Sequence, residues 1–250
     1  MQLEAAKVLI TGANGGIGQQ FIQALLAAGV SKIYAAARKL EALEPIVSLD
    51  PTRIVPIGLD VTMPKGVEQT AVQCSDVTLL INNAGVSKDV GLIAADSTEG
   101  ARLEMETNYF GMLNMCRAFA PILKSNGGGT ILNMLSLVSK VNLPFMGSYC
   151  ASKAACLSLT QGIRAELADQ GTLVVGVMPG TVDTPFAVHY PPPKVPPEEV
   201  VRVALRAVED GVEDVYPGEQ ATYMVDMLLR DPKAVERQVA GLLPELYPFA

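Results

Sequence analysis

The chain is 250 residues long and carries a formal net charge of −7; this length fits one large α/β domain or two small ones. Hydrophobic residues make up 49% and charged residues 18%, so the chain can bury a sizeable core and is not intrinsically disordered. The acidic balance disfavours a nucleic-acid partner, because phosphate backbones attract surplus Lys and Arg. No stretch approaches the roughly 18 uninterrupted apolar residues that cross a membrane, so we expect no membrane partner.

The cysteines predict reduced, buried thiols and no metal centre. Cys74, Cys116, Cys150 and Cys156 form no CxxC pair, and no histidine stands at metal-ligand spacing from them. This usage is typical of a cytoplasmic protein. The first residues also lack the basic segment, apolar run and cleavage site of a signal peptide, so we expect a cytoplasmic location.

Short apolar runs alternate with helical patterns along the chain. Strands are predicted at 7–10, 32–36, 54–59, 77–81, 130–134 and 173–177, and the longer helices at 16–28, 99–124 and 149–168. The strand runs are continuously apolar, as they are when a sheet is covered on both faces. The alternation predicts an α/β fold in one domain over residues 1–250: a doubly wound parallel sheet of about seven strands with helices on both faces.

A glycine-rich turn follows the first predicted strand and opens a helix. The sequence from Thr11 to Gly18 reads TGANGGIG, in which Gly12, Gly16 and Gly18 are spaced as GxxxGxG. Glycine lets the backbone turn tightly and approach a pyrophosphate, and the helix N-terminus offers N–H donors to the anion. This context predicts a dinucleotide-binding site.

The end of the second predicted strand indicates which dinucleotide. NAD sites usually carry an acidic residue about 20 residues beyond the glycines, whereas here the sequence is Ala-Ala-Ala followed by Arg38. A guanidinium can bind a 2′-phosphate through two hydrogen bonds. Arg38 therefore favours NADP(H) over NAD(H), with a solvated surface arginine as the alternative.

Tyr149 and Lys153 stand four residues apart at the start of a predicted helix, so the two side chains share one face. A phenol titrates near pH 10, and an ammonium group a few ångströms away lowers that value by stabilising phenolate. The pair can then act as a general acid/base. An isolated YxxxK is more often two surface residues, so the pair gains meaning from the motifs around it.

Together these motifs resemble the short-chain dehydrogenase/reductase family, in its single-domain branch of this length. The matching pieces are the turn 11–18, Asp60-Val61, the sequence NNAG at 82–85, Asn108, Ser136, Tyr149, Lys153 and the sequence PGTVDT at 179–184. Ser136 precedes Tyr149 by 13 residues, a spacing typical of the family. The resemblance implies a Rossmann-like fold, a nicotinamide cofactor and hydride transfer between a carbonyl and an alcohol.

The resemblance also implies catalytic roles. Tyr149 is expected to protonate the carbonyl oxygen in reduction and to act as the base in the reverse direction, and Ser136 to polarise the carbonyl through a hydrogen bond. Lys153 is expected to hold the nicotinamide ribose and to lower the pKa of Tyr149. Asn108 is expected to position a water in a proton relay to Lys153.

Cofactor contacts follow from the same resemblance. The residues expected to bind the cofactor are Gly12, Asn14, Gly16, Ile17, Gly18, Arg38, Asp60, Val61, Asn82, Ala84, Gly85, Tyr149, Lys153, Pro179, Gly180, Val182 and Thr184. The first of these meet the phosphates and adenosine, and the segment 179–184 surrounds the nicotinamide. Several follow separate predicted strands, whose carboxyl ends form the edge at which open α/β sheets bind ligands.

The candidate substrate-facing side chains are apolar. They are Leu137, Val138, Leu143, Phe145, Met178, Phe186 and Tyr190, and each of them could equally belong to the core. None is a cation that awaits a carboxylate or phosphate, so we expect a small neutral, fairly hydrophobic ketone or aldehyde as substrate.

A proline-rich loop at 185–197, PFAVHYPPPKVPP, is incompatible with a helix or a central strand. It predicts a stiff surface loop and a short, rather open substrate mouth. Its PxxP motif leaves open a role as a docking ligand. His189 is interpreted as a loop histidine, because no serine has the GxSxG elbow of a hydrolase.

The C-terminal part departs from the family pattern. Many members end in a strand and a glycine pair that help form a tetramer, whereas here 214–218 (DVYPG) leads into a predicted helix at 221–230. We therefore expect a homodimer through the helices 99–124 and 149–168, which are too apolar to be fully solvated. A tetramer is the alternative.

Other functions stay open. A 3-oxoacyl-thioester reductase shares the core motifs, although an acidic carrier protein needs a basic docking surface. A non-catalytic NADP(H)-binding regulator could keep the fold without the reaction, although it has no need of an activated phenol. A sugar-nucleotide epimerase needs a larger substrate domain than this length leaves.

Overall fold

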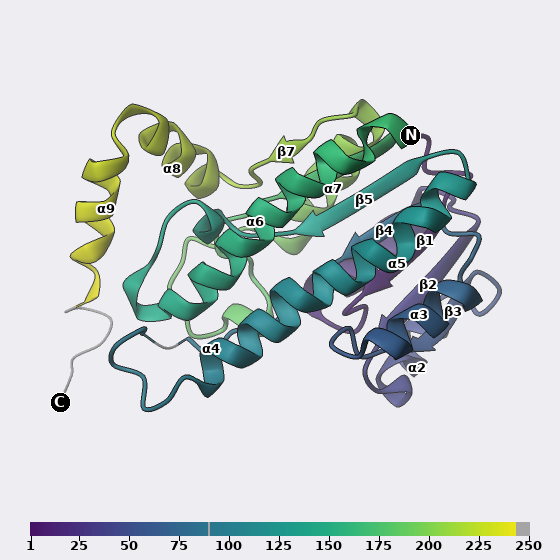
Figure 1. Ribbon diagram of the computed structural model, residues 1–250, viewed down its shortest axis with the longest axis horizontal. Helices are drawn as coiled ribbons and strands as arrows, with labels where there is room; N and C mark the ends of the chain where they lie inside the picture. The colour runs from purple at the N-terminus through teal and green to yellow at the C-terminus, as the bar shows by residue number, and fades with distance from the viewer. Residues whose placement is uncertain (90, 244–250) are drawn as a thin grey trace.

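Seven parallel strands form one sheet in the computed structural model, which describes residues 1–89 and 91–243 (Figure 1). The strands are β1 (Lys7–Thr11), β2 (Lys32–Ala37), β3 (Ile54–Gly58), β4 (Leu79–Asn82), β5 (Gly129–Met134), β6 (Thr172–Val177) and β7 (Asp214–Val215). Their order is β3-β2-β1-β4-β5-β6-β7, and every neighbouring pair is parallel. The predicted doubly wound, Rossmann-like sheet is confirmed.

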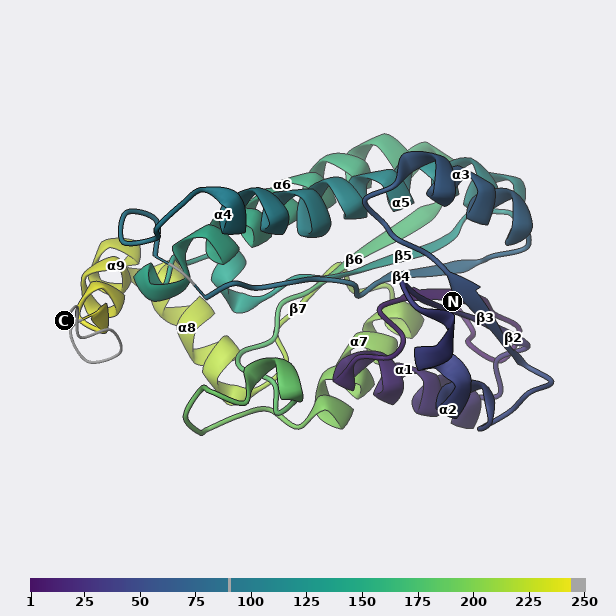
Figure 2. The same cartoon turned by 90° about the horizontal axis from the view of Figure 1, so that it is seen from below.

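Helices cover both faces of this sheet. They are α1 (Gly16–Ala27), α2 (Glu44–Val47), α3 (Pro64–Gln73), α4 (Glu99–Glu104), α5 (Gly111–Ser125), α6 (Gly147–Leu167), α7 (Pro197–Asp210), α8 (Glu219–Arg230) and α9 (Pro232–Ala240). Figure 2 shows α1, α2 and α7 on one side of the sheet and α3, α5 and α6 on the other. The helix predicted at 99–124 is α4 and α5 joined by a π-helical segment, Met105–Phe110.

The first strand shows why the strand sequences are apolar at every position. Val8, Leu9 and Ile10 are all fully buried. Val8 and Ile10 pack in the core that includes α1 and α7, whereas Leu9 packs in the core that includes α3, α5 and α6. Because successive side chains of a strand point to opposite faces, a sheet covered on both faces needs an apolar residue at each position.

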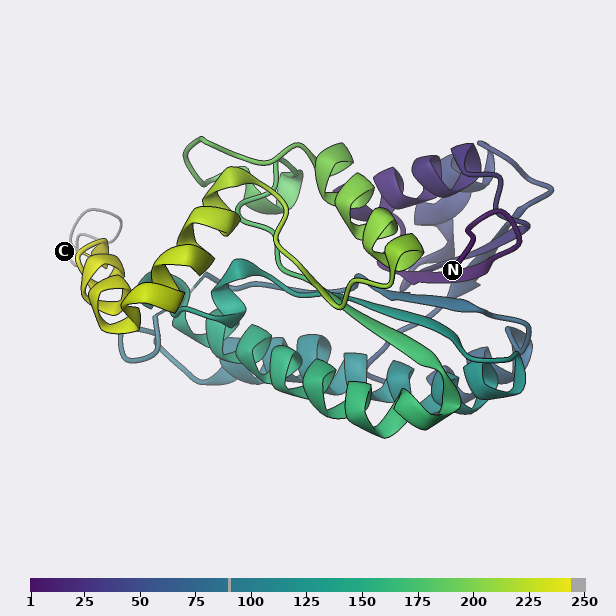
Figure 3. The ribbon, with the colours of Figure 1, turned by 90° about the horizontal axis from the view of Figure 1, so that it is seen from above.

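The C-terminal part differs from the sequence prediction. β7 adds two residues beside β6, and Arg164 of α6 donates a hydrogen bond to Oδ1 of Asp214 at 2.9 Å. The predicted helix at 221–230 begins slightly earlier, as α8, and a second helix, α9, follows it. Figure 3 shows this helix pair beyond the end of the sheet. The sequence did not predict α9, because it is short and buries only Val235 and Val239.

The strand order places the site. β2 and β3 lie on one side of β1, whereas β4 to β7 lie on the other, so the connections after β1 and β4 diverge and leave a crevice at the carboxyl edge. The four cysteines are free and buried, as predicted. Within residues 1–89 and 91–243, no helix is both long and apolar enough to cross a membrane, and no cluster of three or more His, Cys, Asp or Glu could hold a metal.

Candidate active site

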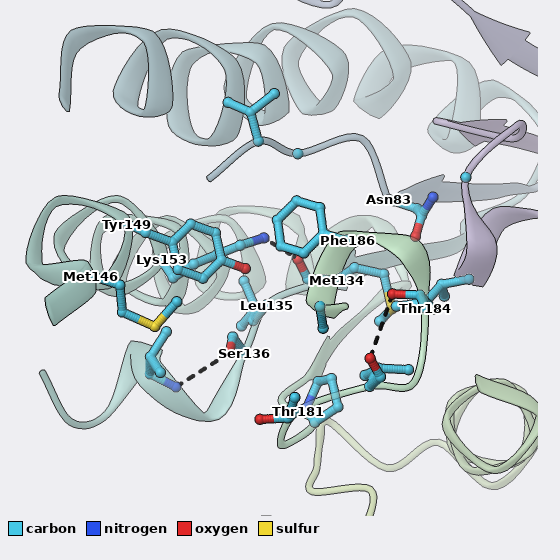
Figure 4. A pocket seen from close by; sticks show the side chains of 18 of the residues that line it. Asn83, Met134, Leu135, Ser136, Met146, Tyr149, Lys153, Thr181, Thr184 and Phe186 are labelled. Carbon is cyan, nitrogen blue, oxygen red and sulfur yellow. Dashed lines mark hydrogen bonds between the residues drawn. The ribbon is translucent and has the colours of Figure 1, made fainter. Parts of the chain in front are cut away.

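A cavity of about 1090 Å³ runs along the carboxyl edge of the sheet. Its lining comes from the segments that follow β1, β2, β3, β4, β5 and β6, together with α6, α8 and α9. Figure 4 shows the part in which Tyr149, Lys153 and Ser136 lie near Thr181, Thr184 and Phe186. Segments that are far apart in the sequence therefore share one cavity.

The glycine turn forms one end of this cavity. Gly12 has a positive φ of +64°, and a Cβ built on it would lie 3.1 Å from the Cα of Ala84. A Cβ on Gly18 would lie 2.3 Å from the carbonyl oxygen of Gly12. No side chain caps the N-terminus of α1 at Gly15, so its first N–H groups can serve an anion. The turn fits a dinucleotide pyrophosphate, because glycine at these two positions lets the turn pack closely on itself and on the loop after β4, which leaves the N-terminus of α1 open to an anion.

The adenosine end of the cavity is lined by Arg38, Asp60 and Val61. Arg38 is exposed and makes no ion pair or hydrogen bond within the described residues. Oδ1 of Asp60 accepts hydrogen bonds from the N–H and hydroxyl of Thr62, at 2.9 and 2.7 Å, which fixes this turn. An unpaired guanidinium at this end fits an additional phosphate.

Tyr149 and Lys153 both project from α6 into the cavity and are both nearly buried. Lys153 Nζ donates a hydrogen bond to the carbonyl oxygen of Met134 at 2.8 Å and lies 5.8 Å from the centroid of the Tyr149 ring (Figure 4). Burial raises the pKa of Tyr149 and lowers the pKa of Lys153, because each charged form loses solvation.

The pKa of Tyr149 therefore shifts opposite to the direction predicted from the sequence. The prediction assumed that the Lys153 ammonium dominates the surroundings of the phenol. In the structure, desolvation is the largest effect on Tyr149, and the ammonium is directed to a backbone carbonyl. The phenol is thus held in its protonated form.

Ser136 follows β5 and lines the same cavity. Its Oγ accepts a hydrogen bond from the N–H of Val138 at 3.3 Å and caps a short 3-10 helix, Leu137–Ser139. This bond uses Ser136 as an acceptor, so the hydroxyl hydrogen remains available for a group in the cavity.

Asn108 lies behind the cavity lining, in the π-helical segment. Its Nδ2 donates to the carbonyl oxygen of Val86 and to Oγ of Ser152, both at 2.9 Å, and its Oδ1 accepts from the N–H of Val86 at 2.8 Å. Asn108 therefore ties the loop after β4 to α6. Its Oδ1 and Lys153 Nζ both approach Gly85, at 3.3 and 3.7 Å from the position of a Cβ built there.

Two residues predicted to bind the cofactor support the cavity without lining it. Gly18 is packed against Gly12, as described above, and Asn82 is buried with its Nδ2 bonded to Oδ1 of Asn133 at 2.9 Å. The neighbouring Asn83 lines the cavity and donates to the carbonyl oxygens of Thr11 and Gly12 at 3.0 and 3.1 Å. All the other predicted cofactor residues line the cavity: Gly12, Asn14, Gly16, Ile17, Arg38, Asp60, Val61, Ala84, Gly85, Tyr149, Lys153, Pro179, Gly180, Val182 and Thr184.

The segment after β6 closes against the glycine turn. Thr184 Cγ2 lies 2.8 Å from the position of a Cβ built on Gly16, so only glycine permits this approach. Val182 pairs with Val195 in an isolated parallel bridge, which anchors the proline-rich loop to the same segment. Six of the seven predicted substrate-facing residues line the cavity: Leu137, Val138, Leu143, Phe145, Phe186 and Tyr190.

Met178 is the exception among the predicted substrate residues. It is fully buried in the core that includes α5 and α6, because it continues β6 on the covered face of the sheet. Residues that the sequence did not indicate line the cavity in its place. They include Asp89 in the loop after β4, Gln220 and Met224 of α8, Gln238 and Val239 of α9, and Leu242.

These helices add to the lining beyond the proline-rich loop that the sequence placed at the substrate mouth. α8 and α9 supply part of the cavity lining that the short proline-rich loop leaves uncovered. The amphipathic character of residues 219–240 was the available signal, but only the packing shows which face meets the cavity. His189 also lines the cavity, and it lies on the exposed loop as predicted.

Comparisons with known proteins agree with this geometry. A family model described as short chain dehydrogenase matches residues 6–193. A short chain dehydrogenase from Burkholderia cenocepacia J2315, crystallised in complex with NADP, is 44% identical, with a TM-score of 0.91 over 96% of this chain and 99% of that chain. An NADP-dependent 3-hydroxy acid dehydrogenase of Schizosaccharomyces pombe is 31% identical over 195 residues, which are 75% of each chain.

The fold also recurs at lower identity. A short chain dehydrogenase/reductase from Burkholderia phymatum, in complex with NAD, is 22% identical, with a TM-score of 0.84 over 94% of this chain and 96% of that chain. Solved structures of this fold therefore include complexes with either nucleotide.

The glycine turn gives a first testable prediction. Gly18→Ala should weaken nicotinamide-nucleotide binding at least about tenfold, or about 1.4 kcal/mol, because the new methyl group meets a backbone oxygen that cannot move away alone. Fluorescence titration measures the dissociation constant. Gly66→Ala is the matched control: it lies in α3 with its nearest neighbour 3.8 Å away, so binding should stay unchanged. Equal binding by both variants would contradict the prediction.

Proposed function

The chain belongs to the short-chain dehydrogenase/reductase family, and from this premise we propose that it is an NADP(H)-dependent reductase of a neutral, fairly hydrophobic ketone or aldehyde, acting reversibly. The observation that carries the proposal is that Ser136, Tyr149 and Lys153 line the same cavity as the glycine turn. A proton donor, a hydroxyl that binds the carbonyl oxygen and a dinucleotide cradle are the components that carbonyl reduction needs.

The chain's own residues would hold the nucleotide along this cavity. The first N–H groups of α1 serve the pyrophosphate, Arg38 the 2′-phosphate, and the segment 179–184 the nicotinamide end. The unpaired guanidinium of Arg38 and the NADP complex of the Burkholderia cenocepacia relative both support NADP(H). When bound, the nicotinamide supplies or accepts the hydride.

Tyr149 donates the proton in the direction of reduction. Burial holds its pKa above the ordinary value, so the phenol keeps its proton at neutral pH until a carbonyl oxygen with developing negative charge accepts it. Ser136 directs its hydroxyl hydrogen to the same oxygen and fixes its position. In the oxidative direction the steps reverse, and Tyr149 must first lose its proton before its phenolate accepts the proton of the alcohol.

Lys153 holds the ribose, and its hydrogen bond to the carbonyl oxygen of Met134 ties it to the end of β5. Its Nζ donates to Met134 at present, and an ammonium has three hydrogens, so two remain for ribose hydroxyls. Asn108 Oδ1 and Lys153 Nζ both approach Gly85, and a water held between them would pass a proton to Lys153. Asn108 is thus a positioning residue for the loop after β4 and for this water.

The substrate class follows from the side chains in the other half of the cavity. Leu137, Val138, Leu143, Phe145 and Tyr190 present mostly apolar surface. Among the described residues, no arginine lines this half of the cavity, and the one lysine is Lys153, which is assigned to the ribose. An anionic substrate therefore has no cationic side chain of its own to bind. The Schizosaccharomyces pombe relative is named as a 3-hydroxy acid dehydrogenase. The most informative test of the substrate class therefore compares a neutral ketone with a carboxylated one.

Two alternatives differ in what they would bind or do. A 3-oxoacyl-thioester reductase would require an acidic carrier protein to dock beside the cavity. A regulator that binds NADP(H) without turning over a substrate would need neither Ser136 nor Tyr149 in the cavity. The presence of both residues beside the glycine turn supports catalysis.

We also propose a homodimer through α5 and α6 and a cytoplasmic location. A groove of about 500 Å³ lies between these helices, Phe110 is 45% exposed next to it, and α6 presents the small residues Ala154, Ser158 and Gly162 on its exposed face. Twofold dimers are the commonest assemblies of soluble proteins. Four free, buried cysteines support a reducing compartment.

A carbonyl screen tests the function. NADPH or NADH consumption is followed by absorbance across ketones, aldehydes, keto acids, phosphorylated ketones and an acyl-carrier thioester. Neutral ketones or aldehydes should exceed the anionic compounds at least about tenfold in kcat/KM, because the apolar half of the cavity offers anions no partner. A clear preference for an anionic compound or for the thioester would refute the proposed substrate class, and turnover of none of them would refute catalysis.

Removal of one oxygen tests the role of Tyr149. Tyr149→Phe should lower kcat at least about 100-fold, because it removes the proton donor, while the dissociation constant of NADPH stays within about twofold. Tyr223→Phe is the control, since Tyr223 is 59% exposed on α8 and does not line the cavity. Substantial turnover by Tyr149→Phe would exclude this residue as the proton donor.

Arg38 determines the choice of nucleotide. Arg38→Asp should shift the kcat/KM ratio of NADPH to NADH at least about tenfold toward NADH, because a carboxylate repels the 2′-phosphate and accepts a hydrogen bond from a 2′-hydroxyl. Arg202→Asp makes the same charge change on the exposed face of α7 and should leave the ratio unchanged. An unchanged ratio in Arg38→Asp would contradict the assignment of Arg38 as the residue that binds the 2′-phosphate.

A further inference from the structure

A carboxylate stands in the substrate half of the cavity. Asp89 follows the NNAG turn after β4 and lines the cavity together with Tyr149. The other carboxylate among the described lining residues is Asp60, which follows β3 at the adenosine end. Among the described residues, Asp89 is therefore the only negatively charged side chain that lines the substrate half of the cavity.

The loop holds Asp89 in a defined conformation. Ser87 Oγ donates a hydrogen bond to Asp89 Oδ1 at 2.5 Å, and the N–H of Asp89 donates to Ser87 Oγ at 3.3 Å. Between them, the N–H of Lys88 donates to Oε1 of Glu104 at 2.7 Å, and Glu104 is completely buried on α4. A buried carboxylate that binds a loop amide is a strong anchor.

The backbone of Asp89 is also unusual. Its φ is +50°, and among the described residues it is the only one other than glycine with a positive φ. This conformation costs energy in a residue with a side chain and persists where the surroundings enforce it, frequently at ligand sites. The hydrogen bonds between Asp89 and Ser87 and from Lys88 to Glu104 restrain this part of the loop.

This loop lies beside the segment that begins α6. A Cβ built on Gly91 would be 3.5 Å from the carbonyl oxygen of Pro144, and Leu92 Cγ lies 2.7 Å from the position of a Cβ on Gly147. Gly147 precedes Tyr149 by two residues. Burial is the main cause of the raised pKa of Tyr149, and the negative charge of Asp89 adds to it, which places the carboxylate within electrostatic range of the phenol.

A carboxylate at this place discriminates among substrates by charge and by hydrogen bonding. Its two oxygens accept about four hydrogen bonds, so it can bind a substrate donor in addition to partners in its own loop. In a cavity with apolar walls, attraction to a cation and repulsion of an anion are stronger than in water. The apolar side chains Leu143 and Phe145 line the same half.

We propose that Asp89 is a specificity-determining residue that binds a hydrogen-bond donor of the substrate, a hydroxyl or an ammonium group close to the reacting carbonyl, and that it disfavours carboxylates. This inference rests on the proposed reductase function. It narrows the neutral substrates to those that carry a donor and extends the substrate class to ketones with a cationic amino group. The preferred substrate is then a hydrophobic ketone that carries a hydroxyl or amino substituent next to the carbonyl.

The test uses phenyl ketones that differ only in the second group on the carbonyl: ethyl, hydroxymethyl, aminomethyl or carboxylate. For the wild-type enzyme, kcat/KM should be at least about tenfold higher for the hydroxymethyl and aminomethyl compounds than for the ethyl compound, and lowest for the carboxylate. Asp89→Asn keeps the size of the side chain and removes its charge. It should abolish most of the aminomethyl preference and raise the carboxylate relative to the ethyl compound.

Two further variants complete the design. Asp96→Asn makes the same change on an exposed residue outside the cavity, and the substrate ranking should match the wild type. Asp89→Ala removes the acceptor as well and should abolish the hydroxymethyl preference. Because every readout is a ratio between substrates on one enzyme sample, partial loss of folded protein does not change it.

The outcomes separate this inference from the proposed function. Reduction of ketones by the wild type without a preference for the donor-bearing compounds, or an unchanged ranking in Asp89→Asn, overturns the role of Asp89 and leaves the reductase function standing. A wild-type preference for the carboxylate also overturns it. Absence of turnover on every carbonyl compound with either nucleotide overturns both proposals.

Discussion

The contact between the first glycine turn and the loop after β4 is the constraint on which the site depends. A Cβ on Gly12 would lie only 3.1 Å from the Cα of Ala84, and a Cβ on Gly18 would lie 2.3 Å from the carbonyl oxygen of Gly12, which is too close for any side chain. Asn83 and Thr11 then join the two loops through side-chain hydrogen bonds. Because β1 and β4 are neighbours at the reversal of strand order, this contact forms the floor of the crevice that receives a dinucleotide.

Burial sets the protonation states in the catalytic part of the cavity. A phenol and an ammonium group that leave water both shift toward their uncharged forms, as Tyr149 and Lys153 do here. The carbonyl of Met134 gives Lys153 a hydrogen-bond partner without adding a negative charge. The phenol therefore keeps its proton at neutral pH next to the hydroxyl of Ser136, and burial makes it a weaker acid than a phenol in water.

The substrate half of the cavity has a different origin from the nucleotide half. Its lining comes from the loop that contains Asp89, the turn that contains Phe145, the proline-rich segment and the two C-terminal helices. These elements lie outside the sheet, so they can vary without disturbing the cofactor cradle. Within one fold, substrate choice therefore depends on loops and terminal helices, whereas the reaction type depends on α6 and the strand ends.

The strands, the glycine turn and the pair Tyr149 and Lys153 could all be predicted from the sequence. These features are local: each strand reads as a continuous apolar run, the turn needs glycine within eight residues, and side chains at i and i+4 of a helix meet without reference to the rest of the chain. Most of the other residues that line the cavity were expected from the family resemblance of the motifs and not from local geometry.

Which remote residues line the cavity, and which partners they meet there, was decided by the tertiary structure. Met178 and Val182 are both apolar residues after β6, yet only the packing shows that the first is in the core and the second lines the cavity. Three features depend on segments remote in sequence: the hydrogen-bond partner of Lys153, the direction in which the pKa of Tyr149 shifts, and the lining residues that α8 and α9 supply. Desolvation and long-range contacts are properties of the folded surroundings, and a linear pattern of residues contains no record of them.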